Sequence, residues 1–196
     1  MAEERPRFLC DHMLGSLARW LRFLGYDTLY PEERKERPPD GRGGPLPDDT
    51  RLLGLAEKEG RLLLTRDREL AARAGKRALL IEGTALESQL AQLQDRVGLD
   101  LKGHDRLLRC SRCNAMLVEA GREEVRRIAH ERYGVAGAEQ IPEGVLARHE
   151  RFWRCPGCGQ VYWPGSHYDR IIGRIEGLEK GAAERATRGA GQRREE

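Results

Sequence analysis

The sequence predicts an α/β fold, in which a small open parallel sheet carries helices on both faces and is followed by a cysteine-rich module. Short apolar runs alternate with segments of helical periodicity over residues 8–98. This order of elements is typical of parallel sheets joined by right-handed crossovers. Two C-x-x-C pairs then replace the alternation. We expect an α/β domain over residues 1–100, a metal-binding module with a helical insert over residues 101–172, and a disordered or frayed helical tail over residues 173–196.

The first strand and helix follow from the start of the chain. The apolar run from Phe8 to Cys10 predicts a strand. A helix should follow Asp11 and end at Gly25, because leucines recur before this glycine at helical spacing, at Leu14, Leu17, Leu21 and Leu24. Residues 27–30 fit a second strand. The stretch 31–47 is rich in proline, glycine and charge, so we expect a flexible loop there.

The later elements repeat the pattern of helix and strand. The segment from Arg61 to Thr65 has an unbroken apolar centre, which is typical of a strand buried in a parallel sheet. Thr84 and Glu87 have the spacing of a capping box and should begin a helix that continues to Val97. The remaining expected elements are helices over 49–60 and 69–74 and a strand over 78–81.

Four of the five cysteines form two C-x-x-C pairs, at Cys110, Cys113, Cys155 and Cys158. Two such turns can surround one ion with four thiolates, and this closed shell is typical of structural zinc. A redox dithiol is the alternative, but that motif requires a single C-x-x-C after a strand. The remaining cysteine, Cys10, should be a small buried apolar residue. Unpaired cysteines and a metal site indicate a reducing compartment.

Composition narrows the function less than the motifs do. Lys and Arg number 35 against 32 Asp and Glu, so net charge does not indicate a partner. No stretch approaches the roughly 20 apolar residues that span a bilayer, and the start of the chain has no apolar block fit for a signal peptide. We expect a cytoplasmic protein without a membrane partner and without an organic cofactor.

Acidic residues follow two of the predicted strands. Asp11 follows the first strand and Asp67 follows the strand that ends at Thr65, and ligands of open α/β sheets gather at the carboxyl ends of strands. Asp49 begins the helix that leads into this strand, with Asp48 as its close substitute. Three convergent carboxylates favour Mg²⁺ or Mn²⁺, which can activate water to hydrolyse a phosphodiester. The alternative is that each aspartate only caps a helix.

Three blocks of the chain carry a family resemblance. They are FLCDHMLGSLARWLRFLGYDT, DDTRLLGLAEKEGRLLLTRDREL and the two C-x-x-C turns, here called knuckles, with the second block of cysteines in CPGCGQVYWPGSHYDRI. They resemble the Mut-seven C-terminal ribonuclease family over about residues 7–172. The resemblance implies a PIN-like, Rossmann-like three-layer nuclease domain joined to a zinc ribbon. It also implies that Asp11, Asp49 and Asp67 are catalytic and bind Mg²⁺ or Mn²⁺.

The chain departs from the usual PIN pattern in one place. Most PIN domains supply another acidic residue from a middle helix, and the loop over 31–47 stands there instead. The acidic residues of this loop that could take the place of the missing one are Glu32, Glu33, Glu36 and Asp40. The departure leaves open one metal rather than two.

Arginines near these motifs are candidate RNA contacts. Arg19 and Arg22 lie three apart on the predicted first helix and could hold a phosphate; alternatively, they form an ordinary solvated face. Near the knuckles, arginines accompany aromatic residues that suit phosphates and bases or instead form the core of the module. The candidates there are Arg109, Arg112 and Arg154, in a group with Arg106 and Arg151, and the aromatic residues beside them are Phe152, Trp153, Tyr162 and Trp163.

These observations lead to two hypotheses of function. The first is a metal-dependent endoribonuclease that hydrolyses RNA while the zinc ribbon positions the substrate. The second is a non-catalytic RNA-binding protein, associated with ribosomes or tRNA, that keeps the fold for its shape. Neither the RNA nor the oligomeric state follows from the sequence.

Overall fold

A computed structural model describes residues 5–31, 49–101, 108–133, 141 and 143–192. The chain divides into two compact units, residues 1–114 and 115–196. Within the part that the structure describes, every helix is too short or too polar to cross a membrane.

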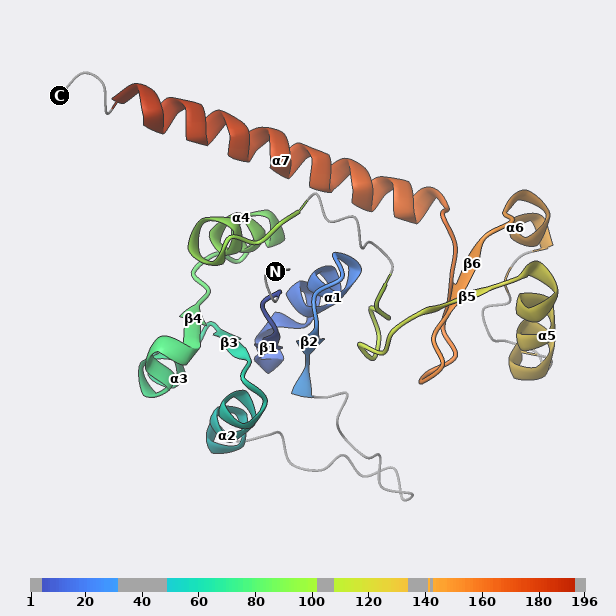
Figure 1. The fold of residues 1–196 in the computed structure, drawn as a ribbon, viewed down its shortest axis with the longest axis horizontal. Coiled ribbons are helices and arrows are strands. Elements are labelled where there is room, and N and C mark those ends of the chain that lie inside the picture. Colours follow the sequence, from blue (N-terminus) through green and yellow to red (C-terminus); the bar gives the residue numbers. More distant parts are fainter. Residues whose placement is uncertain (1–4, 32–48, 102–107, 134–140, 142, 193–196) are drawn as a thin grey trace. The chain divides into compact units, whose positions relative to one another are not determined.

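The first unit contains a parallel sheet, as the sequence predicted (Figure 1). Its four strands lie in the order β2-β1-β3-β4. In register, Leu9 lies beside Leu63 of β3 and Leu29 of β2. The strands are β1 (Phe8–Cys10), β2 (Thr28–Leu29), β3 (Leu62–Thr65) and β4 (Ala78–Leu80).

The helices of this unit also lie close to their predicted ranges. Gly25 and Gly60 follow two of them with φ of 87° and 61°, a conformation that suits glycine. The predicted capping box is wrong, because the last helix has Ala85 at its N-cap and no side-chain cap. The helices are α1 (Gly15–Phe23), α2 (Asp49–Glu59), α3 (Arg68–Ala74) and α4 (Leu86–Val97), with short 3₁₀ turns at His12–Leu14 and Gly75–Arg77.

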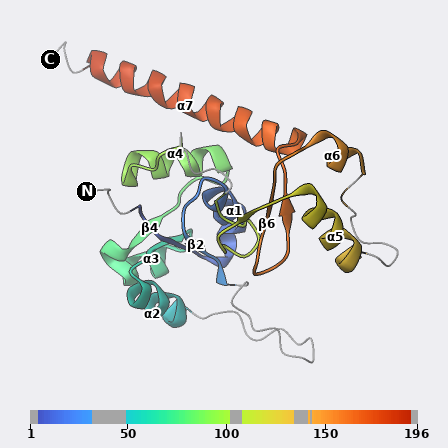
Figure 2. The same ribbon diagram turned by 45° about the vertical axis from the view of Figure 1, so that its right-hand side comes forward.

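Apolar side chains cover both faces of this sheet. Leu9 and Leu63 pack against α2 and α3, through buried side chains that include Leu52 and Leu70. Helix α1 contacts β1, β2 and α4 instead, and the two helix layers are visible in Figures 1 and 2. Cys10 is completely buried, in agreement with its predicted place in the core.

The second unit is built on an antiparallel sheet in the order β5-β6-β7. Strands β6 (Phe152–Arg154) and β7 (Val161–Tyr162) pair next to each other, and α5 (Arg122–Tyr133) lies within the predicted helical insert. Strand β5 (Val118–Ala120) and helix α6 (Glu143–Arg148) were not predicted. Helix α7 (Ser166–Gln192) extends through most of the stretch expected as a tail.

Candidate functional site

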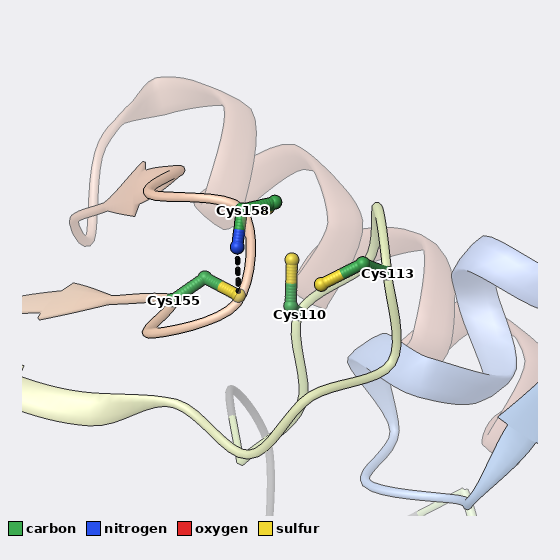
Figure 3. A group of neighbouring side chains, drawn as sticks. All are labelled: Cys110, Cys113, Cys155 and Cys158. Atoms are coloured by element: carbon green, nitrogen blue, oxygen red, sulfur yellow. Dashed lines mark hydrogen bonds between the residues drawn. The ribbon is translucent and has the colours of Figure 1, made fainter. Parts of the chain in front are cut away.

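The four predicted zinc ligands lie together. The sulfur atoms of Cys110, Cys113, Cys155 and Cys158 are all within 4.8 Å of one another (Figure 3). Zn–S bonds of about 2.3 Å in a tetrahedron would place the sulfurs about 3.8 Å apart, so small side-chain shifts would complete the shell. Cys110 and Cys155 are buried, and the backbone N–H of Cys158 donates to Sγ of Cys155 at 3.3 Å. The group can hold a metal ion such as zinc.

The two knuckles have the same kind of backbone turn. In the first, the N–H of Asn114 donates to the carbonyl of Cys110 at 2.9 Å, and in the second the N–H of Gly159 donates to the carbonyl of Cys155 at 2.8 Å. Asn114 and Gly159 have φ of 68° and 69°. Asparagine tolerates this left-handed conformation better than most side chains. Each C-x-x-C turn is therefore closed by a residue suited to reverse the chain beneath the sulfurs.

Arg22 connects the first knuckle to the parallel sheet. Its Nε donates to the carbonyl of Thr28 at 2.7 Å, and its Nη1 donates to the carbonyls of Ser111 and Arg112, each at 3.2 Å. The residue is 0% exposed. The guanidinium of Arg22, which the sequence suggested as an RNA contact, is therefore bonded to carbonyl groups inside the protein. Arg19, its predicted companion, is exposed on α1.

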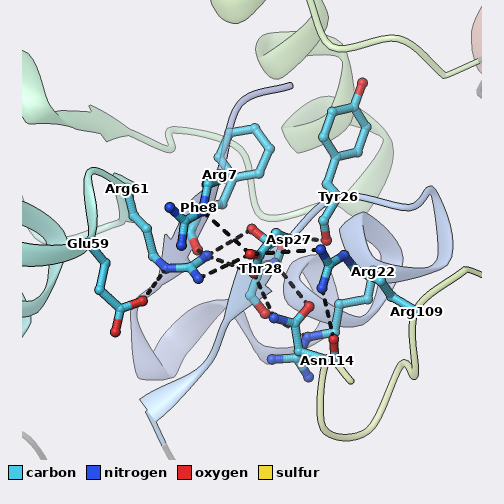
Figure 4. A network of polar contacts seen from close by, with 10 residues as sticks. All are labelled: Arg7, Phe8, Arg22, Tyr26, Asp27, Thr28, Glu59, Arg61, Arg109 and Asn114. Atoms are coloured by element: carbon cyan, nitrogen blue, oxygen red, sulfur yellow. Dashed lines mark hydrogen bonds and ion pairs between the residues drawn. The ribbon is translucent and has the colours of Figure 1, made fainter. Parts of the chain in front are cut away.

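An ionic network at the amino edge of the sheet centres on Asp27 (Figure 4). Its carboxylate accepts hydrogen bonds from Arg61, at 2.8 and 3.2 Å, and from Nδ2 of Asn114 at 2.7 Å. Arg7 and Arg109 lie 3.4 and 3.8 Å from Oδ2. A second amide contact joins the same elements, since Oδ1 of Asn114 accepts from the N–H of Thr28.

The network sets the charge of Asp27. Burial raises the pKa of this carboxyl, but the hydrogen bonds from Arg61 and Asn114 outweigh that effect. The charges of Arg61 and Arg109 act in the same direction, and the pKa falls from 3.8 to about 2. The sequence prediction missed this residue. A signal was present, because Asp27 and Arg61 directly precede strands and the amino ends of parallel strands share an edge.

Asp11 lies at the opposite, carboxyl edge of the sheet, directly after β1. Its side chain is buried, and Oδ2 accepts a hydrogen bond from Oγ1 of Thr65 at 2.8 Å. Oδ1 accepts no hydrogen bond from the described residues and contacts Nδ1 of the neighbouring His12. The same Thr65 hydroxyl accepts from the N–H of Asp67 at 3.0 Å. Thr65 thus links the two predicted catalytic aspartates.

The other two aspartates have structural contacts of their own. Asp67 is the N-cap of α3, where Oδ1 accepts from the N–H groups of Glu69 and Leu70 at 2.7 and 3.0 Å. Oδ2 of Asp49 accepts from Arg73 at 3.0 Å at the surface. In the described ranges, the four cysteines form a group with donor atoms mutually within 4.8 Å, and the three aspartates do not. The further candidates Glu32, Glu33, Glu36, Asp40 and Asp48 lie outside those ranges.

The remaining predicted RNA contacts take different places. Arg109 donates to the carbonyl of Asn114 at 3.0 Å, so it belongs partly to the amino-edge network. Arg112 is exposed, and Arg154 pairs with Glu124 of α5.

A protein-family model matches most of the chain. Residues 6–175 match the family model described as Mut7-C RNAse domain. No curated protein and no solved structure shows significant similarity to the chain.

Proposed function

The chain belongs to the Mut7-C RNAse domain family, and from this membership we propose that it is a metal-dependent endoribonuclease with its active site at the carboxyl edge of the parallel sheet. Membership supports a ribonuclease-like function and RNA as the substrate. The place of the active site, the metal and the roles of individual residues are our proposal.

One observation carries the choice of site: a buried carboxylate with an oxygen that lacks a hydrogen bond. Asp11 is 1% exposed, and its Oδ1 accepts no hydrogen bond from the described residues, although Nδ1 of the exposed His12 lies against it. Such an atom is costly in a protein interior unless a cation or ligand satisfies it. The fixed Oδ2, bonded to Thr65, holds the group in one orientation. These features suit a hard divalent cation such as Mg²⁺ or Mn²⁺.

Asp67 and Asp49 are the further ligands that we propose for this site. The hydrogen bonds that Asp67 accepts from described residues end at Oδ1, which leaves Oδ2 for a ligand. The pair of Asp49 with Arg73 is exposed on both sides, and surface pairs of this kind contribute little to stability. A bound ion would supply an activated water and stabilise charge on the reacting oxygens. The three carboxylates would hold and orient that ion.

We assign the first unit to the PIN-like fold and the antiparallel sheet with its knuckles to a zinc ribbon. The parallel strand order and the four-cysteine group support these assignments. Four thiolates leave no open ligand position, so zinc there would stabilise the protein and perform no chemistry. Arg19, Arg112 and Arg154 remain proposed contacts to the RNA backbone, together with Arg109.

A non-catalytic RNA-binding protein is the second candidate. Two of the three carboxylates favour this candidate because they already have structural contacts. Asp67 caps α3, and Asp49 pairs with Arg73. If those contacts persist with metal present, the edge would keep its shape without binding a catalytic ion.

Calorimetric titration of Mn²⁺ into the zinc-loaded protein separates these candidates. The nuclease proposal expects saturable binding that Asp11→Asn removes and that the control Asp95→Asn, on the exposed side of α4, leaves unchanged. Absence of binding to the wild type, or binding unaffected by Asp11→Asn, would favour the non-catalytic protein.

A further inference from the structure

In the antiparallel sheet of the second unit, the described core residues lie on one face. Strand pairing places Glu119, Trp153 and Tyr162 side by side, across β5, β6 and β7. Their neighbours in each strand point to the other face. Those neighbours include Ala120, Phe152 and Val161, which are buried in the core with α5 and α6 residues.

The aromatic residues of this sheet fall into two groups, one in the core and one on the opposite face. Phe152 is 0% exposed and Trp163 packs against the core cluster, so these two stabilise the module. Trp153 and Tyr162 are only partly buried and are not members of that cluster. Their position on the opposite face leaves a role in binding open to them.

An arginine accompanies the aromatic pair. Arg151 directly precedes β6, two residues before Trp153, and its side chain therefore points to the same face as Trp153. Its guanidinium carbon lies 5.4 Å from the centroid of the Trp153 ring, which is a cation–π distance. The side chain also pairs with Glu119 at 3.2 Å, and both side chains are more than 60% exposed, at 68% and 62%. This surface pair can open at little cost.

We infer that the face formed by Arg151, Trp153 and Tyr162 binds unpaired nucleotides of RNA. The inference rests on the proposed ribonuclease function and names its substrate class. Aromatic rings stack on any nucleobase, and arginine adds a contact to the backbone phosphate. Bases in a duplex are stacked on each other and cannot reach such a face, so single-stranded segments are selected.

Binding can be measured separately from cleavage. The probe is a fluorescently labelled 12-nucleotide oligouridylate, and the competitor is a 12-base-pair RNA duplex of random sequence. Fluorescence anisotropy is recorded with the full zinc-loaded chain in buffer without Mg²⁺ or Mn²⁺. We expect tighter binding of the single strand. Trp153→Leu should weaken it about tenfold, whereas Trp153→Phe should retain most of the affinity because a ring remains.

A matched control separates the effect of the position of Arg151 on RNA binding from the effect of losing one positive charge. Arg126→Gln on α5 removes one exposed, ion-paired arginine, as Arg151→Gln does directly before β6. We expect the Arg151 change to weaken binding several-fold more than the Arg126 change. Circular dichroism and zinc content must match the wild type, and if Trp153→Leu does not fold, the comparison of Arg151→Gln with Arg126→Gln still tests this face.

Several results would overturn the inference. They are unchanged single-strand affinity in Trp153→Leu, equal losses for the two arginine variants, or equal affinity for duplex and single strand. The proposed nuclease function fails in a different way: intact single-strand binding with no cleavage at any concentration of Mg²⁺ or Mn²⁺ rejects catalysis while supporting this surface.

Discussion

The side-chain amide of Asn114 donates a hydrogen bond to the carboxylate of Asp27 at 2.7 Å. One residue closes the first cysteine knuckle, and the other lies directly before β2. Through the same amide, Oδ1 of Asn114 accepts from the backbone of Thr28. The backbone turn that presents Cys110 and Cys113 is therefore bonded to the parallel sheet. We expect metal binding and the stability of the first unit to depend on each other.

Substitution of Asn114 tests the strength of this connection. Asn114→Gly keeps the left-handed backbone but removes both side-chain hydrogen bonds, and we expect a loss of about 1–2 kcal/mol in the free energy of unfolding. Asn114→Ala should lose about 1 kcal/mol more, because alanine is strained at positive φ. Urea unfolding of the zinc-loaded protein measures both. A Gly variant as stable as the wild type would show that the amide contacts contribute nothing.

Asp27 should make stability depend on pH. Its pKa in the folded protein is lowered from 3.8 to about 2, so its stabilising contribution is present above pH 4. The contribution is lost as the pH falls from about 4 to 2, and it amounts to about 2 kcal/mol.

The measurement is the difference in unfolding free energy between the wild type and Asp27→Asn at several pH values. This difference cancels the loss of zinc that both proteins suffer when thiolates are protonated. A gap that stays constant from pH 6 to pH 2.5 would contradict the assigned role of the charge.

Arg22 should affect zinc retention without touching zinc. Lysine cannot reach three carbonyl oxygens with a planar fork of donors, so Arg22→Lys should loosen the first knuckle and release zinc roughly tenfold faster to a chelator. Arg19→Lys, on the exposed side of the same helix, is the matched control. Equal release rates for the two variants would show that Arg22 does not support the knuckle.

Thr65 should hold Asp11 in place. Thr65→Ser keeps the hydroxyl that donates to Asp11, whereas Thr65→Val removes it and leaves a second oxygen of a buried carboxylate without a donor. We expect Val to lower the unfolding free energy by about 1–3 kcal/mol and to reduce Mn²⁺ affinity, with Ser close to the wild type. Thermal unfolding and calorimetry give the two values. If Val and Ser variants bind Mn²⁺ equally, Thr65 does not orient the carboxylate.

The sequence predicted the sheet region well, because alternating apolar runs and leucine periodicity are strong local signals. It missed β5, a three-residue strand with the sequence VEA whose one buried side chain is Ala120. Such a strand has no period to detect and depends on pairing with β6. Likewise, α6 lies in a polar stretch, and its buried Leu146 became informative only once the core was known.

Arg22 shows why the site was harder to predict than the fold. Its spacing from Arg19 suggested a shared exposed face, but Arg22 lies four residues after the buried Ala18 and therefore on the inner face of α1. For the aspartates, strand order predicts the edge on which Asp11 and Asp67 lie. It does not predict which carboxylate oxygens serve helix capping, because these hydrogen bonds depend on local geometry.

Cleavage of RNA by Asp11→Asn combined with Asp67→Asn tests the central claim most directly. Asparagine can still accept from Thr65 and can still cap α3, so the double variant should fold and retain zinc. With Mg²⁺ or Mn²⁺ present, we expect its rate on single-stranded RNA to fall at least about 100-fold below that of the wild type. A double variant that cuts RNA as fast as the wild type would contradict an active site at this edge of the sheet.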